Sequence, residues 1–205
     1  MRLPETAHTS LPWRIHEITP DFRLEDVWAL PTPGGRGDFP RLVELIASFD
    51  SSQSPSAAVR TLFAIRSKIG EVLGLDRPEA GLGARVPRLR DRLPADLRDT
   101  PPGSDSRALP LSPLYLLDDE WAAELANRTV HGVIHLGWVP DGTGAYRGQM
   151  AILVKPNGRR GTAYMAAIAP FRHLIVYPAI VRQIERAWRA GADEPTPAHA
   201  EPRPA

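Results

Sequence analysis

The sequence predicts an α+β fold in which an antiparallel sheet packs on, or wraps around, a long C-terminal helix. Two observations carry this prediction. Residues 129–139 and 146–155 alternate apolar and mixed side chains, and the turn-forming stretch 140–144 (PDGTG) separates them, as in a β-hairpin. From Gly161, apolar residues recur at steps of three and four over almost thirty positions, which is the spacing of one helix face.

Length and composition bound the organisation of the chain. The 205 residues and 42% hydrophobic content suffice for one domain, expected over residues 13–190 between a disordered N-terminus (1–12) and a disordered tail (191–205). A formal charge of +1 creates no field that favours nucleic acid, so no nucleic-acid partner is expected. The absence of cysteine excludes disulfides and cysteine-ligated zinc. Because residues 1–17 lack the apolar core of a signal peptide, the default expectation is a cytoplasmic protein.

The first third of the chain predicts one weak strand and amphipathic helices. Residues 13–18 (WRIHEI) alternate weakly, as a strand does, and residues 21–28 are compatible with a short helical turn or an irregular segment. Residues 40–49 place four apolar side chains on one helix face. A second helix is predicted over residues 54–73, where Ser-Pro provides an N-cap and a first helical position.

A proline-rich connection precedes the hairpin. Residues 76–110 show no sustained period of 2 or 3.6, which predicts a long loop that is either solvated or acts as a lid or wrapping arm. The apolar run 114–117 (LYLL) is compatible with a buried strand. Residues 118–126 begin with three acids and continue with an apolar face, which predicts a short helix that feeds the first hairpin strand.

Each hairpin strand has one apolar face. The even-numbered residues from Val130 to Trp138 share a face, and His131 and His135 lie on the other. The second strand repeats the division. We therefore expect a sheet with one buried side, covered by the C-terminal helix, and with the imidazoles on the reverse side. Two strands alone are marginal, so further strands are needed.

The C-terminal helix is predicted to be interrupted. Pro170 and Pro178 each lack a backbone N–H and should kink or break it. The run 163–181 approaches the length of a membrane span, but Arg172 and His173 stand near its centre. Because a charge inside a bilayer is costly, no transmembrane span is expected.

Several segments resemble a bacterial family catalogued as a domain of unknown function, DUF2867. The resemblance is strongest in the patterns T-V-H-x-x-x-H-x-G-W, within residues 127–139, and K-P-x-G-x-x-G-x-x-Y-M, within 146–188; residues 13–22 and 114–124 add to it. It implies a helix-grip fold similar to the START and birch-pollen-allergen (SRPBCC-like) superfamily, where the sheet wraps the last helix around an apolar cavity. Only three or four of the six or seven strands of such folds can be found in the sequence.

The resemblance implies no cofactor for this chain. Family members also occur behind a dinucleotide-binding domain, but Gly142, Gly144 and Gly148 do not have G-x-G-x-x-G spacing and belong to the hairpin. No dinucleotide-binding segment is therefore expected.

His131 and His135 are the sharpest candidates for chemistry. On one strand face they would lie about 13 Å apart at roughly 3.3 Å per residue, which is too far to share a metal ion. No metal site is therefore expected. One imidazole could act as an acid or base in a polar pocket. The alternative is that both lie on the wetter side of the sheet or are bonded to a neighbouring loop.

Six residues are candidate contacts for a ligand between sheet and helix. An asparagine could bond the ligand or cap a corner. An arginine, next to His173, could bind a carboxylate or phosphate or simply face solvent. The aromatic and methionine side chains could line a cavity or belong to the core. The six are Asn127, Trp138, Met150, Tyr164, Phe171 and Arg172.

We expect a small-molecule binding domain of helix-grip type with an apolar or amphipathic ligand. Whether it catalyses a reaction stays open; the superfamily suggests proton transfer on a carbonyl compound by His131 or His135. The alternative is a non-catalytic module whose C-terminal helix docks on a protein or membrane surface through its arginine-rich end. The sequence does not indicate an oligomeric state.

Overall fold

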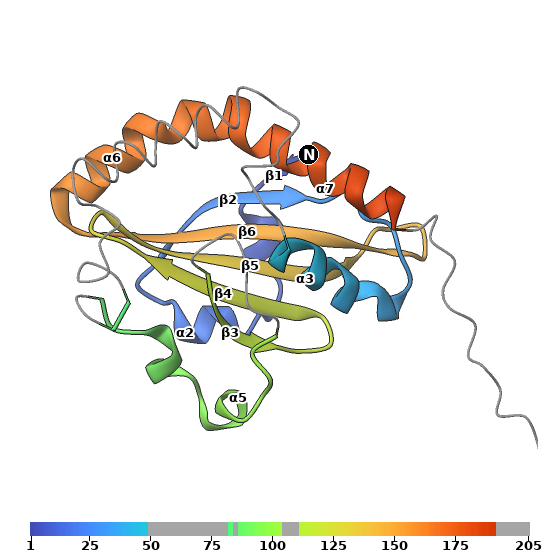
Figure 1. The fold of residues 1–205 in the computed structure, drawn as a ribbon, viewed down its shortest axis with the longest axis horizontal. Helices are drawn as coiled ribbons and strands as arrows, with labels where there is room; N and C mark the ends of the chain where they lie inside the picture. Colours follow the sequence, from blue (N-terminus) through green and yellow to red (C-terminus); the bar gives the residue numbers. More distant parts are fainter. Residues whose placement is uncertain (49–81, 84–85, 104–110, 192–205) are drawn as a thin grey trace, which may run out of the picture.

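A six-stranded antiparallel sheet forms the centre of the computed structural model, which describes residues 1–48, 82–83, 86–103 and 111–191 (Figure 1). The strand order is β1-β2-β6-β5-β4-β3, so β1 and β3 are the edges of an open sheet. The strands are β1 (Arg2–Leu3), β2 (Arg23–Ala29), β3 (Ser112–Leu116), β4 (Glu120–Ala126), β5 (Val130–Pro140) and β6 (Tyr146–Pro156).

Helices cover both faces of this sheet. Figure 1 shows α6 and α7 crossing one face as a long arch, with α2 and α5 on the opposite side. The predicted α+β class, with an antiparallel sheet and a long C-terminal helix, is confirmed. The helical elements are α1 (Thr6–Thr9), α2 (Ile15–Ile18), η1 (Arg36–Asp38), α3 (Phe39–Ala47), η4 (Leu89–Arg92), α5 (Ala95–Arg98), α6 (Gly158–Phe171), η5 (Arg172–Val176) and α7 (Tyr177–Ala190).

The predicted hairpin is the long central pair β5 and β6. Ile134 lies opposite Ile152 in a register that runs the full length of both strands. In the turn, Asp141 accepts a hydrogen bond from the backbone N–H of Thr143 at 2.8 Å. Gly142 and Gly144 have φ angles of +89° and +95°, a region that disfavours residues with a Cβ atom. The turn sequence therefore fixes the register that alternation predicted.

The apolar face of the hairpin packs beneath the C-terminal helix, as expected. Trp138 of β5 lies 6.0 Å from Trp188 of α7 between ring centroids. α3, which confirms the helix predicted at 40–49, closes this core, with the Arg41 guanidinium 4.1 Å from the Trp188 ring centroid. Near the start of α6, a smaller cluster joins Met165 to Val130.

The prediction of a single buried face is wrong, because the reverse face is also covered. α2, η4 and α5 bury a second cluster there, which includes Trp13, Leu89 and Tyr115. His131 and His135 consequently have exposed fractions of 4% and 0%. The covering segments lie outside the hairpin in sequence, so the alternation within the hairpin carried no information about them.

The short helix predicted at 118–126 is wrong, because the segment forms β4. Alanine, glutamate and leucine favour a helix locally. In the sheet, β4 pairs with β3 on one side and β5 on the other. Its alternation places Trp121 and Ala123 in the helix-side core and Ala122 in the opposite one. Two strand partners and two buried faces thus outweigh helix propensity.

The predictions at the N-terminus are corrected in the same way. Residues 13–18 contain the helix α2 rather than a strand, and residues 21–28 contain most of the strand β2 rather than a helical turn. Residues 1–12, expected to be disordered, form β1 and α1, and β1 pairs with β2. These local patterns were weak, and long-range pairing decided the outcome.

Three further predictions fall wholly or partly on residues that the structure does not describe. The helix expected at 54–73 lies outside the described residues, as does nearly all of the tail 191–205. Of the expected loop 76–110, the described parts contain η4 and α5.

The long C-terminal helix changes its winding in the middle. η5 is a π-helical segment that begins two residues after Pro170, and Pro178 stands in the first turn of α7. The predicted local break at the prolines is thus present as a π segment. Within the described residues, Gly161–Ala190 is the one helix long and apolar enough to cross a membrane by length and composition. Core helices of globular proteins also pass that test.

Candidate functional site

A bulge in β2 brings two carboxylates beneath the C-terminal helix. Leu24 pairs with Leu153 of β6 and Asp26 pairs with Ile152, so Glu25 is the additional residue of the bulge. The side chain of Asp26 is fully buried, at 0% exposure. Bulges often redirect side chains beside functional sites.

The π segment η5 supplies the cationic side chains that face these carboxylates. Nη2 of Arg172 lies 3.1 Å from Glu25 Oε2, and Nδ1 of His173 lies 3.0 Å from Asp26 Oδ1. The edge strand β1 adds Arg2, whose Nε lies 3.4 Å from the same Asp26 oxygen. We refer to these groups, together with one neighbouring indole, as the Asp26 cluster: Arg2, Glu25, Asp26, Trp28, Arg172 and His173.

Several buried polar atoms of the Asp26 cluster have no hydrogen-bond partner among the described residues. They are both carboxylate oxygens of Asp26, Nε1 of Trp28, Nε of Arg172 and Nδ1 of His173. The approach of His173 to Asp26 is thus an ion-pair distance without hydrogen-bond alignment. Buried polar atoms in folded proteins are nearly always satisfied. A group of five in one place therefore marks a position that water or a ligand can complete.

The electrostatics of the cluster disfavour the ionised form of Asp26 relative to an exposed carboxyl group. Burial raises the pKa of Asp26, although His173, Arg172 and Arg2 oppose the rise. Tyr177 of α7 packs against Trp28 with ring centroids 5.6 Å apart, and burial raises the pKa of its hydroxyl. A buried carboxyl with a raised pKa beside an imidazole is a group suited to proton transfer.

On the reverse face, each hairpin histidine is paired with a glutamate of β4. Nε2 of His131 lies 2.7 Å from Glu124, and Nε2 of His135 lies 3.0 Å from Glu120. Glu124 also accepts hydrogen bonds from the backbone N–H of Leu89 at 3.0 and 3.1 Å. The two histidines therefore share a face, as predicted, but belong to separate pairs.

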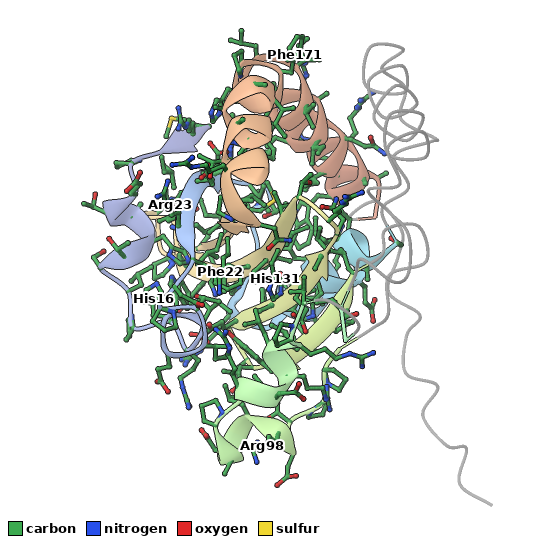
Figure 2. The ribbon with its side chains drawn as sticks, turned by 90° about the vertical axis from the view of Figure 1, so that its left-hand side faces the viewer. His16, Phe22, Arg23, Arg98, His131 and Phe171 are labelled. Atoms are coloured by element: carbon green, nitrogen blue, oxygen red, sulfur yellow. The ribbon has the colours of Figure 1, made fainter. Side chains whose placement is uncertain are left out.

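Two further histidines extend the His135 pair toward the surface. Nδ1 of His135 lies 3.1 Å from Nε2 of His8, and Nδ1 of His8 lies 3.2 Å from Nε2 of His16. His8 is 1% exposed, whereas His16 is partly exposed. Figure 2 shows His16 near the edge of the molecule, while His131, beside Phe22, lies closer to its middle. We call Glu120, His135, His8 and His16 the histidine chain.

Burial and neighbouring charges shape the histidine chain. Burial lowers the pKa of His8 to about 3, with His135 and His16 adding to the effect. Burial and His135 also lower the pKa of His16. Burial alone would raise the pKa of Glu120, but the hydrogen bond and charge of His135 hold it below its ordinary value. Burial thus disfavours the charged form of His8 and, to a lesser degree, of His16.

The structure separates most of the predicted ligand contacts. Asn127 caps the β4–β5 turn, where its Oδ1 accepts hydrogen bonds from Thr129 and the Val130 N–H. Trp138 and Met150 are buried in the helix-side core. Only Arg172 belongs to the Asp26 cluster.

The two other predicted contacts lie on α6. Phe171 is 53% exposed, at the outer end of α6 in Figure 2. The side chain of Tyr164 lies outside the described part. The six-residue ligand site stays a prediction.

Sequence reasoning missed the acidic partners. Glu120 and Glu124 were assigned to a helix, and Asp26 to a helical turn, so neither set was placed opposite the histidines. One signal was present: Glu120 and Glu124 have the same four-residue spacing as His131 and His135, which matches two antiparallel strands. No group of three or more histidine, aspartate or glutamate side chains among the described residues is arranged to hold a metal ion.

Comparisons with known proteins assign the chain to a family without an attached activity. The family model described as "Protein of unknown function (DUF2867)" matches residues 18–179. This range contains Asp26, Glu120, His135 and η5, whereas His8 and His16 precede it. The curated proteins and the solved structures contain no match to the chain.

Proposed function

We propose that the chain, which belongs to the DUF2867 family of proteins of unknown function, binds a small amphipathic molecule between β2 and η5. The observation that carries the proposal is the buried Asp26 carboxylate, neither oxygen of which has a hydrogen-bond partner among the described residues. A buried carboxylate without hydrogen-bond donors is costly even beside cationic side chains, and folded proteins accept such a cost chiefly where function uses the group.

The atoms of the Asp26 cluster define the head group of the ligand. Asp26 offers two acceptor oxygens, and Nε1 of Trp28 and Nε of Arg172 offer two donors. A head group that carries both a hydroxyl and a carbonyl would satisfy both sets. The apolar body of the ligand would lie toward Ile152 and Ile168, which join the smaller cluster beneath α6. A hydroxy-ketone with a short alkyl chain has this chemistry.

The helix-grip type of binding stays a prediction. A long helix across one face of an antiparallel sheet supports a ligand position between the two. The sheet is open, however, and no solved structure matches the chain. Binding to the Asp26 cluster depends only on the groups named above.

The test uses 3-hydroxy-2-octanone as the probe and 2-octanone, which lacks the hydroxyl, as its comparison. We expect the hydroxy-ketone to shift the NMR signal of the Trp28 indole N–H, with an affinity at least about tenfold above that of the ketone. Asp26→Asn should weaken binding of the hydroxy-ketone by about tenfold. Asp21→Asn is the matched control, because Asp21 pairs with Lys155 on the surface. Equal affinities for the two probes, or an unaffected Asp26→Asn variant, would contradict the proposal.

A second candidate function, docking of the C-terminal helix on a membrane or protein, has one observation in its favour. Phe171 and Leu174 are 53% and 77% exposed, side by side with Ala167 and Pro170 on the outer face of the helix. The arginine-rich end adds exposed Arg182, Arg186 and Arg189. Co-flotation with vesicles of phosphatidylglycerol would support this candidate if Phe171→Ser abolished it.

A further inference from the structure

The histidine chain lies on the face of the sheet opposite the Asp26 cluster and has no part in the proposed ligand site. Its three imidazoles and one carboxylate are joined by contacts of 3.0, 3.1 and 3.2 Å, from fully buried Glu120 and His135 to partly exposed His16. All three distances suit hydrogen bonds that involve a ring nitrogen. The histidine chain is therefore a continuous series of contacts from the core to the surface.

The donors around Glu120 fix the direction of these hydrogen bonds. Its two oxygens accept from the backbone N–H groups of Arg14 and Ile15 at 2.9 and 3.0 Å and from the Tyr115 hydroxyl at 2.7 Å. A carboxyl group with this many donors is an acceptor on all sides. His135 must then donate its Nε2–H to Glu120, and in the neutral ring, which carries one proton, Nδ1 is left as an acceptor.

The same reasoning passes along the chain. Because Nδ1 of His135 accepts, His8 donates its Nε2–H to it and presents its own Nδ1 as an acceptor. His16 then donates its Nε2–H to His8. When the three imidazoles are neutral, each thus carries its proton on Nε2 and points it inward, and Nδ1 of His16 is the outer end of the array.

We propose that His16, His8 and His135 form a proton-transfer relay between the protein surface and the Glu120 carboxylate. A proton that binds Nδ1 of His16 allows the Nε2 proton of His16 to move to Nδ1 of His8. The Nε2 proton of His8 then moves to Nδ1 of His135. One proton enters, two move between nitrogens, no electrons are exchanged, and the charge arrives as a His135 imidazolium beside Glu120. The reverse steps release the proton.

The surroundings hold the rings of the relay in place. The rings of His8 and His16 meet edge to face at 4.9 Å, and those of His8 and His135 at 4.8 Å. Trp13 packs on His135 and occupies the space over Gly137 that a Cβ atom would take. Arg14 and Glu17 pair with each other on the exposed side at 3.0 Å. Because the pKa of His8 is about 3, the middle ring carries protons without storing them near neutral pH.

Imidazole NMR on the full-length, ¹⁵N-histidine-labelled protein tests the tautomers without any substitution. We expect Nε2–H tautomers at His8, His16 and His135 near neutral pH. An Nδ1–H tautomer at His8 would overturn the relay, since the hydrogen bonds could not then point in one direction.

Exchange of the imidazole protons with water tests the transfer itself. In His16→Gln, the side-chain amide can still donate to His8 but cannot pass a proton. We expect the Nε2–H of His135 to exchange at least ten times more slowly in this variant. His131 is the internal control, because it is buried on the same face and, among the described residues, its hydrogen-bond partner is Glu124 and not the histidine chain, so its exchange should not change. Arg182→Gln, at an exposed position of α7 that belongs to neither cluster, should leave both rates unaltered. An unchanged His135 rate in His16→Gln, or equal slowing of His131, would show that exchange proceeds by local opening and would refute the relay.

Discussion

At the scale of single residues, Asp26 is predicted to lower stability in exchange for binding. Its pKa is raised in the folded state, so the folded state disfavours the ionised form and loses stability as pH rises above the unfolded pKa. Asp26→Asn should therefore increase the free energy of unfolding at pH 7 by about 1 kcal/mol. Urea denaturation at pH 7 and pH 4 checks this, because the gain should shrink at the lower pH. A variant less stable than the native protein at pH 7 would contradict it.

His8 is expected to change the pH dependence of stability in the opposite direction, because it stabilises the fold at neutral pH and not in acid. Its folded pKa of about 3 lies below the ordinary value of 6.5, so its contribution is fully present above pH 6.5 and is lost as pH falls toward 3. Between pH 7.5 and 4.5 the native protein should lose about 3 kcal/mol more than His8→Gln does. Urea denaturation across this range provides the measurement. Parallel pH profiles for the two proteins would show that His8 is not held neutral by the fold.

At the scale of elements, Glu124 connects η4 to the sheet. Its carboxylate accepts the Leu89 N–H and faces His131, so Glu124→Ala leaves two buried groups without an acceptor. We expect a loss of about 3 kcal/mol in the free energy of unfolding. Glu44→Ala, at an exposed position of α3, should change it by less than about 0.5 kcal/mol. Chemical denaturation of both variants provides the measurement. An equally small loss in Glu124→Ala would show that the Glu124–His131 pair does not stabilise the fold.

The two halves of the C-terminal helix should respond differently to substitution. Trp188 of α7 is 3% exposed and contacts Trp138, so Trp188→Ala should cost about 3–5 kcal/mol of stability. Leu174→Ser, in η5, should cost less than about 0.5 kcal/mol because that side chain is 77% exposed. Thermal unfolding followed by circular dichroism measures both. A large loss in Leu174→Ser would mean that an unseen contact covers this surface.

The elements also show what the sequence could and could not predict. β5, β6 and the C-terminal helix could be predicted because the periodicity of their apolar residues is strong. These residues pack together in the helix-side core. The sequence did not predict β4, because its alanines and glutamates favour a helix. Pairing with β3 and β5, and the contacts of its glutamates with His131 and His135, outweigh that preference in the fold. At the candidate sites, the sequence predicted the shared face of His131 and His135, and the role of Arg172 in binding stays a prediction. The sequence did not predict the roles of Glu120, Asp26 and His8, because their partners lie 15 to 147 residues away in the chain.

At the scale of the whole molecule, the N-terminal segment is predicted to be part of the fold. It supplies the edge strand β1 and the imidazole of His8. A variant that begins at Ser10 should lose about 3 kcal/mol in the free energy of unfolding, because it lacks the β1–β2 hydrogen bonds and the bond between His8 and His135. It should also self-associate, because β2 becomes an exposed edge. Urea denaturation and size-exclusion chromatography check the two effects. Full-length His8→Gln separates the loss of the imidazole from the loss of the strand.

The path of this segment has a thermodynamic consequence. Arg2 approaches the Asp26 carboxylate on one face of the sheet, and His8, six positions later, hydrogen-bonds His135 on the other. Any event that displaces the segment at one end must alter the energy of the other. By reciprocity, a ligand bound at the Asp26 cluster should change the affinity of His16 for a proton. Protonation of His16 should in turn change the affinity of the Asp26 cluster for the ligand by the same factor.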